Sequence, residues 1–202
     1  MALPGRIIYV IDDDAAMREG LSSLLRSIGH TVILFASAAA FLAYARPATS
    51  SCLVLDVRLP DRSGLDLQRD LRVAGEDLPI IFITGHGDIP MTVRAMKAGA
   101  IEFLSKPFRE QDLLDAIASA LTRDADVRSR RAQQAIVHER LTTLTPREGQ
   151  VMECLLRGML NKQIAASLGV TEVTVKLHRR HVMEKMLVSS LVELAQLMAR
   201  IR

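Results

Sequence analysis

The first part of the chain alternates short apolar segments with amphipathic ones, and this alternation constrains the fold more than any other feature. Over about 120 residues, five strand-like segments are each followed by a helix-like segment. Such alternation predicts a parallel sheet with helices on both faces. The expected strands are Arg6–Ile11, His30–Phe35, Cys52–Asp56, Pro79–Thr84 and Ile101–Ser105, and the expected helices are Ala15–Ser27, Ser37–Ala45, Leu65–Arg72, Ile89–Ala98 and Arg109–Leu121.

The strand pattern stops after residue 121, and the rest of the chain reads as helical. Residues 122–140 are polar and rich in helix formers, with no Gly or Pro, so they predict a continuation of the preceding helix into a linker. Thr145–Glu148 and Ser190–Glu193 have the capping-box pattern. Four short helices are expected in residues 141–202, and the second and third, Asn161–Leu168 and the helix after Thr171, are joined by a turn at Gly169.

Charge divides the chain in the same way. Residues 1–122 carry a formal net charge of −3 and residues 123–202 carry +6. A basic second part is the usual electrostatic signature of nucleic-acid binding, although a solvated basic face on a helical bundle is an equally simple interpretation. Neither a secretory signal nor a membrane-spanning run is evident, so we expect a cytoplasmic protein without a membrane partner.

Acidic residues end two of the predicted strands. Asp12, Asp13 and Asp14 follow the first strand, and Asp56 ends the third. Because the carboxyl ends of parallel strands lie at one edge of a sheet, these carboxylates should converge there. Clustered carboxylates favour a hard cation, and Mg²⁺ is the best match. Helix capping is the simpler alternative, and for Asp14 it accounts for the residue fully.

Two further strand ends carry phosphate-binding chemistry. Thr84 ends the fourth strand, and Lys106 follows the fifth strand and precedes a proline with which a cis peptide bond is expected. A hydroxyl and an ammonium beside carboxylates and Mg²⁺ form a phosphoryl-transfer site, in which a carboxylate can be the nucleophile. Four chemically compatible strand ends favour this function over chance.

These segments resemble the receiver domain of two-component response regulators. The resemblance covers residues 5–121 and is nearest to the FixJ, TodT and StyR subgroup. It implies a flavodoxin-like (CheY-like), doubly wound, five-stranded domain over residues 1–121. The motifs that carry it are Val10–Asp14, Leu53–Gly64, Ile83–Asp88 and Phe103–Phe108.

The resemblance also implies residue roles. Asp56 is the expected phosphoacceptor, with Lys106 binding the phosphoryl group and Thr84 moving toward it. Asp13 is an expected direct Mg²⁺ ligand and Asp12 a ligand through water. Two roles complete the set: a metal-binding backbone carbonyl at Arg58 and an aromatic switch at Phe103, for which an ordinary core phenylalanine is the alternative.

The C-terminal region resembles the LuxR-type (NarL/FixJ-type) helix-turn-helix domain. The resemblance covers residues 141–202 and rests on Leu144–Glu148, Asn161–Ala165, Leu168–Val170 and Thr174–His178. It implies that the third helix of this domain enters the major groove of DNA. Residues expected to face bases are Lys176, Leu177 and Arg180, and those expected near the DNA backbone are Thr171, Thr174, His178 and Arg179. The run Leu187–Ser190 departs from the family pattern and puts a helix cap or a phosphate contact in doubt.

The sequence therefore predicts a DNA-binding transcriptional regulator that a sensor histidine kinase phosphorylates on Asp56. Phosphorylation is expected to repack the face formed by residues 88–121, giving a homodimer or releasing the DNA-binding domain, with RNA polymerase as a further candidate partner. Two alternatives stay open. One is an aspartyl-phosphate phosphatase, although Arg58 stands where the haloacid-dehalogenase type has a second Asp. The other is a transcription factor that uses the receiver only for dimerisation and needs no phosphate.

Overall fold

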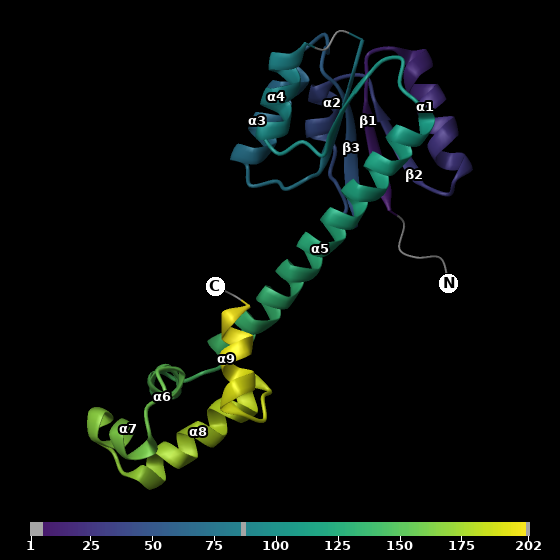
Figure 1. Ribbon diagram of the computed structural model, residues 1–202. Helices are drawn as coiled ribbons and strands as arrows, with labels where there is room; N and C mark the ends of the chain where they lie inside the picture. Colours follow the sequence, from purple (N-terminus) through teal and green to yellow (C-terminus); the bar gives the residue numbers. More distant parts are fainter. Residues whose placement is uncertain (1–5, 86–87, 201–202) are drawn as a thin grey trace. The chain divides into compact units, whose positions relative to one another are not determined.

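The computed structural model describes residues 6–85 and 88–200, which form two compact units, Met1–Arg128 and Ser129–Arg202 (Figure 1). The outermost residues of the predicted domains, 1–5 and 201–202, lie outside the described residues. So do two residues of the Ile83–Asp88 motif, His86 and Gly87. Among the described helices, none is long and apolar enough to cross a membrane.

The first unit is built on one parallel five-stranded sheet in the order β2-β1-β3-β4-β5. The chain runs from β1 outward in one direction to β2 and in the other to β3, so strand order reverses between β1 and β3. This doubly wound arrangement confirms the predicted fold class. The strands are β1 (Ile7–Ile11), β2 (Thr31–Phe35), β3 (Ser51–Asp56), β4 (Ile80–Thr84) and β5 (Glu102–Ser105).

Helices cover both faces of this sheet. Helices α1 and α5 pack on one face, over Ile8 and Val10, and helices α2, α3 and α4 pack on the other, over Tyr9 and Leu55. β1 and β3 are buried on both sides, which explains why their sequences are continuously apolar rather than alternating. The helices are α1 (Ala15–Ser27), α2 (Ala38–Ala43), α3 (Gly64–Val73), α4 (Ile89–Lys97) and α5 (Glu110–Thr142).

Helix α5 continues past Leu121 to Thr142, so the expectation that residues 122–140 continue the last helix of the sheet domain is confirmed. Asp124 is buried, accepts a hydrogen bond from the Ser51 backbone N–H at 3.0 Å and pairs with Arg128 at 2.6 Å. This contact attaches a polar turn of α5 to the start of β3. The division into residues 1–121, 122–140 and 141–202 stays a prediction.

The second unit contains the last turns of α5 and four short helices. Val137 of α5 packs with Val182, Met186 and Leu194 in one apolar cluster, and a second cluster centres on Val151, Leu155 and Ile164. The helices are α6 (Pro146–Leu156), α7 (Asn161–Leu168), α8 (Glu172–Met186) and α9 (Leu191–Ala199).

Capping residues set the limits of these helices. The predicted capping box at α6 is present, and Thr171 caps α8. At α9 the prediction is only half right: Ser190 accepts from the Glu193 N–H, but the Glu193 carboxylate bonds to Ser189 rather than returning to the cap residue. Gly169 ends α7 with φ of 65°, the left-handed conformation that a tight helix-turn-helix junction requires.

Candidate functional site

The carboxyl ends of β1 and β3 bring two aspartates together at the point where strand order reverses. The two strands are adjacent and pair Ile11 with Leu55, so the residues that follow, Asp12 and Asp56, lie at the same edge. Both are buried, although the Asp56 side chain retains 10% of its accessible surface while that of Asp12 has none. Of the two carboxylates, Asp56 is therefore the one that an incoming group can reach.

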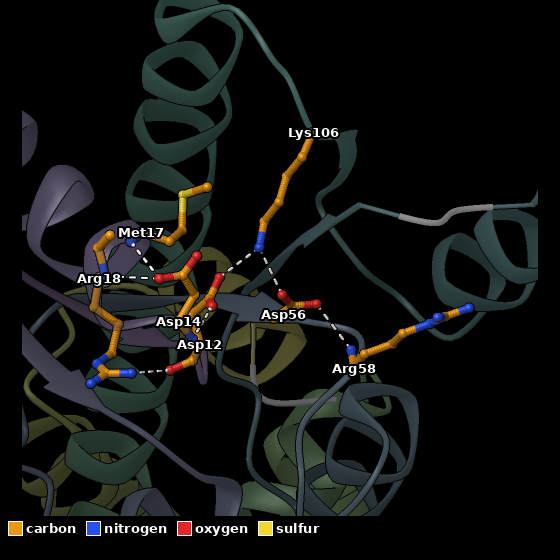
Figure 2. A network of polar contacts seen from close by, with 8 residues as sticks. Asp12, Asp14, Met17, Arg18, Asp56, Arg58 and Lys106 are labelled. Atoms are coloured by element: carbon orange, nitrogen blue, oxygen red, sulfur yellow. Dashed lines mark hydrogen bonds and ion pairs between the residues drawn. The ribbon is translucent and has the colours of Figure 1, made fainter.

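Lys106 joins the two carboxylates (Figure 2). Its Nζ donates to Asp12 Oδ2 and to Asp56 Oδ2, each at 2.7 Å. Its backbone N–H donates to the Thr84 carbonyl at 2.7 Å, which fixes the loop after β5 to the end of β4. The expected cis peptide bond between Lys106 and Pro107 is present. The four strand ends singled out from the sequence thus meet at one place.

The pKa values of Asp12 and Lys106 are both raised, for different reasons. Burial raises the pKa of the Asp12 carboxyl above its ordinary value, outweighing the hydrogen bonds from Lys106 and from the Asp14 N–H, which lower it. For Lys106, burial lowers the pKa, but the hydrogen bonds to Asp12 and Asp56 prevail and raise it. Lys106 therefore stays charged in the pocket. An additional cation beside it would stabilise the ionised form of Asp12.

The other two aspartates after β1 have different surroundings. Asp14 caps α1, accepting from the Ala16 N–H at 2.8 Å and the Met17 N–H at 3.4 Å, as the simpler interpretation of this residue predicted. Asp13 is exposed beside the pocket. Sequence reasoning missed Arg18, whose Nη1 donates to the Asp12 carbonyl at 2.8 Å and holds the start of the loop (Figure 2).

The acidic residues meet the geometric requirement for one shared cation. Ligand oxygens of Asp12, Asp13 and Asp56 lie within 4.8 Å of one another. An all-oxygen donor set of this kind suits Mg²⁺, which favours carboxylates together with water and phosphate. The Arg58 N–H donates to Asp56 Oδ1 at 2.9 Å, and its side chain extends away from the carboxylates (Figure 2). Arg58 thus meets the pocket through its backbone.

The two residues expected to switch lie on neighbouring strands. Thr84 is fully buried at the end of β4, and Phe103 on β5 is half-buried. The Phe103 ring packs against Phe82 with a centroid separation of 6.0 Å. Its partial exposure distinguishes Phe103 from the fully buried Phe82 beside it.

Gly64 is a second residue whose role the sequence did not indicate. A Cβ at this position would lie 2.5 Å from the Asp56 carbonyl oxygen and 3.1 Å from the Leu55 side chain. The Gly64 N–H also donates to the Val57 carbonyl at 2.8 Å. Only glycine allows α3 to begin this close to the end of β3, so Gly64 fixes the backbone that carries Asp56.

The predicted DNA-contacting residues lie on or immediately before α8. Leu177 and Arg180 face away from the buried Val175. By contrast, His178 and Arg179, three and four residues after Val175, lie on its side of the helix. Lys176, Leu177 and Arg180 are exposed, as expected of residues that face bases. The residues expected near the DNA backbone are exposed at Thr171 and partly exposed at Thr174, His178 and Arg179.

Local contacts already engage several of these side chains. Thr171 caps α8 through the Thr174 N–H, and the two threonine hydroxyls lie 2.9 Å apart. Arg180 Nε donates to Glu184 Oε1 at 2.7 Å. Sequence reasoning missed Val173, which is 75% exposed and shares the helical spacing of Lys176, Leu177 and Arg180. Val173 begins the i, i+3, i+4, i+7 series that these three residues complete, so this spacing could have identified it from the sequence.

Comparison with known proteins gives a family match for the sheet domain and another for the C-terminal helices. Residues 8–118 match the response regulator receiver domain, and residues 142–198 match the luxR family of bacterial regulatory proteins. Nodulation protein W of Bradyrhizobium diazoefficiens is 52% identical over 191 residues, which covers 95% of this chain and 84% of the relative. The response regulator protein TodT of Pseudomonas putida is 50% identical over 196 residues, covering 97% and 86%.

Solved structures give the same result. The response regulator StyR superposes with a TM-score of 0.89 at 51% identity, covering 97% of this chain and 99% of StyR. Full-length FixJ from B. japonicum has a TM-score of 0.60 at 42% identity, covering 99% and 98%.

The fold and the matched families define a two-component response regulator. More closely, the chain belongs to the family that joins a receiver domain to a LuxR-type DNA-binding domain, whose members are transcriptional regulators.

Proposed function

We propose that Asp56 is the phosphoacceptor of this regulator. The observation that carries the proposal is the contrast between the two pocket aspartates: Asp56 keeps an accessible edge while Asp12 is enclosed. In the reaction, a carboxylate oxygen of Asp56 attacks the phosphorus of a phosphohistidine on a sensor kinase. The P–N bond breaks, a P–O bond forms and the histidine nitrogen leaves. The chain's own chemistry is limited to this transfer.

The surrounding residues have distinct proposed roles. Asp12, Asp13 and Asp56, with the Arg58 backbone carbonyl, would hold Mg²⁺, which supplies charge neutralisation for the phosphoryl oxygens. Lys106 already lies 2.7 Å from Asp56 Oδ2 and is placed to pair with a phosphoryl oxygen. Thr84, at the next strand end, would donate its hydroxyl to the same group.

Phosphorylation would change the face formed by α4, β5 and α5. Movement of Thr84 toward the phosphoryl group would open space beside β5 that the half-buried ring of Phe103 is placed to fill. On this face α4 exposes Ile89, Val93 and Met96, and Ile89 is 81% exposed. Apolar side chains this exposed are suited to a second copy of the chain, so we propose a phosphorylation-dependent homodimer.

The opposite charges on this face favour pairing of identical copies. Helix α4 carries Arg94 and Lys97, while α5 carries Asp112 and Asp115, all exposed. In a twofold arrangement the basic α4 of one copy can meet the acidic α5 of the other.

The paired copies would bind promoter DNA through α8. Lys176, Leu177 and Arg180 would face bases, and Thr171, Thr174, His178 and Arg179 would contact the DNA backbone. The exposure of Lys176, Leu177 and Arg180 supports the assignment of the residues that would face bases. RNA polymerase is a further partner consistent with a transcriptional regulator, and the cytoplasm is the compartment where these partners meet.

The phosphoacceptor is tested by incubating the full chain with acetyl phosphate and Mg²⁺ and measuring intact mass. We expect one phosphoryl group on the wild type and none on Asp56→Asn. Asp14→Asn is the matched control: it lies beside the pocket, its asparagine still caps α1, and it should be phosphorylated normally. Phosphate uptake by Asp56→Asn would refute the assignment.

A further inference from the structure

Three metal-ligating side chains meet inside the helical unit, away from the receiver pocket. Glu148 lies on α6, and His178 and His181 lie three residues apart on α8. One ligand atom from each lies within 4.8 Å of those of the other two. In the described residues this group and the acidic pocket are the clusters that meet this geometric condition, and only this one contains imidazoles.

The Glu148 carboxylate is fixed in a way that leaves one oxygen available. Oε2 accepts from Lys185 Nζ at 2.6 Å and from the Thr145 N–H at 2.9 Å. Oε1 faces His181 Nδ1 at 3.4 Å. Donors that saturate one oxygen and orient the other toward a site are typical of carboxylates that bind metals.

The separation between these two atoms also fits joint coordination of one ion. At 3.4 Å it is long for an N–H···O hydrogen bond, which is usually about 2.7–3.2 Å. In a tetrahedral zinc site with bonds of about 2.0–2.1 Å, neighbouring ligand atoms lie roughly 3.3 Å apart. Glu148 Oε1 and His181 Nδ1 therefore already stand at the spacing of two ligands to one ion.

His178 supplies an independent observation. Its Nδ1 is buried and has no hydrogen-bond partner among the described residues. A buried polar nitrogen without a partner is uncommon and calls for an explanation. Coordination of the imidazole would fix its orientation and tautomer, which hydrogen bonding here does not.

We propose that Glu148, His178 and His181 form a binding site for a divalent transition metal of the Zn²⁺ class. Two imidazoles and one carboxylate select such ions over Mg²⁺, which prefers oxygen alone. The His181 side chain is 41% exposed, so a fourth position is open to water. The nearest competing cation is the Lys185 ammonium, which occupies the other oxygen of Glu148. A bound ion would link α6 to α8, the helix proposed to contact DNA.

The test is calorimetric titration of the chelator-treated full chain with Zn²⁺, in buffer with excess Mg²⁺ to occupy the acidic pocket. We expect one Zn²⁺ per wild-type chain and at least tenfold weaker binding by His181→Asn, because one of three protein ligands is lost. His138→Asn is the matched control, since His138 is an exposed histidine on α5, outside the cluster, and should bind as the wild type does.

A spectroscopic measurement makes the test independent of variant folding. Co²⁺ bound to the wild type should give the intense visible absorption of a four-coordinate site, and Zn²⁺ should abolish it. Absence of stoichiometric Zn²⁺ binding by the wild type, or equal binding by His181→Asn and His138→Asn, would overturn the proposal. Neither result bears on phosphorylation of Asp56, which is measured without Zn²⁺.

Discussion

Each unit of the molecule contains a lysine that pairs with buried carboxylates. The two lysines differ in how many carboxylates they pair with and in what else those carboxylates bind. In the receiver, Lys106 bridges Asp12 and Asp56, which come from strands far apart in the sequence. In the helical unit, Lys185 binds Glu148, whose same oxygen also accepts a backbone N–H in a capping box.

The pKa values of Glu148 and Asp12 are shifted in opposite directions. Hydrogen bonds from Lys185 and from the Thr145 backbone lower the pKa of Glu148 to about 2, whereas burial raises the pKa of Asp12. The Glu148 oxygen that accepts from Lys185 and the Thr145 backbone stabilises the fold, and the other oxygen is the one proposed to bind a metal ion. Carboxylates that outnumber their one ammonium, with an accessible edge, are suited to bind a cation and to react. Surroundings therefore separate a structural ion pair from a reactive one more clearly than the residue types do.

The largest effect should follow removal of the receiver lysine. Lys106→Ala deletes the positive charge that pairs with Asp56, and we expect phosphorylation by acetyl phosphate to slow by about 10²-fold, a typical loss for one electrostatic group. Lys162→Ala, an exposed lysine on α7, is the control and should react at the wild-type rate. An unchanged rate in Lys106→Ala would show that this lysine takes no part in the transfer.

Removing the helical carboxylate should affect stability instead. Glu148→Ala leaves Lys185 without its carboxylate partner and breaks the capping box, so we expect a loss of about 2–3 kcal/mol in the unfolding free energy of the helical unit. Chemical denaturation followed by circular dichroism measures this loss. Glu153→Ala on the same helix breaks only an exposed pair with Arg157 and should cost less than about 0.5 kcal/mol. Equal losses in the two variants would contradict the structural role of Glu148.

A smaller and pH-dependent effect is expected in the receiver. Asp61 accepts from the Ala39 N–H at 2.8 Å and the Ala38 N–H at 3.4 Å, at the start of α2. Partial desolvation raises its pKa, but these backbone hydrogen bonds outweigh it and lower the pKa below the ordinary 3.8. Because Asp61 is exposed and solvent screens its charge, Asp61→Ala should cost at most about 1 kcal/mol at neutral pH.

The sign of the pH dependence follows from that lowered pKa. The stability that Asp61 contributes is fully present above pH 3.8 and is lost as pH falls through its folded-state pKa. Denaturation at a series of pH values should show the difference between wild type and Asp61→Ala shrinking below pH 3.8. A difference that persists unchanged in acid would mean that the charge of Asp61 is not what stabilises α2.

The smallest effect should be a gain in stability at the end of α8. Leu187 is 70% exposed and has φ of 55°, a left-handed conformation that costs a leucine roughly 1 kcal/mol. Leu187→Gly should raise the unfolding free energy by about 0.5 kcal/mol, because the greater freedom of glycine in the unfolded chain offsets part of the relief. Val192→Gly, at a position of similar exposure inside α9, should give no gain, because glycine is disfavoured within a helix. A loss of stability in Leu187→Gly would indicate that its side chain makes a contact worth more than the strain.

The departure from the family pattern at Leu187–Ser190 thus has a structural counterpart. Sequence comparison indicated that a helix cap or a phosphate contact was altered there, and the structure places the left-handed C-cap at Leu187. The conformational strain itself was not predictable, because it depends on how α8 is anchored. Arg140 donates to the Met186 carbonyl at 3.0 Å, and Lys185 donates to the Thr143 carbonyl at 3.0 Å.

Sequence reasoning succeeded where topology brings residues together. Strand ends in a parallel sheet share an edge, so the meeting of Asp12, Asp56, Thr84 and Lys106 followed from the strand assignment alone. The residues expected on the exposed face of α8 followed instead from the resemblance to the LuxR-type domain.

The features that were missed depend on side-chain reach and close backbone contact. Gly64 is required by a backbone approach that no periodicity encodes. Asp124 is buried by a hydrogen bond to Ser51, which lies 73 residues earlier in the chain. Three-dimensional packing also brings His178 and His181 beside Glu148, which lies on another helix.

The most direct test of the account is the mass of the chain in solution, measured by light scattering with and without Mg²⁺ and beryllofluoride, a phosphoryl mimic. The account predicts that the mass doubles in the wild type and in Asp14→Asn when both are added, and stays that of one chain in Asp56→Asn. A wild-type mass that does not change, or one that doubles equally in Asp56→Asn, would contradict a switch operated through Asp56.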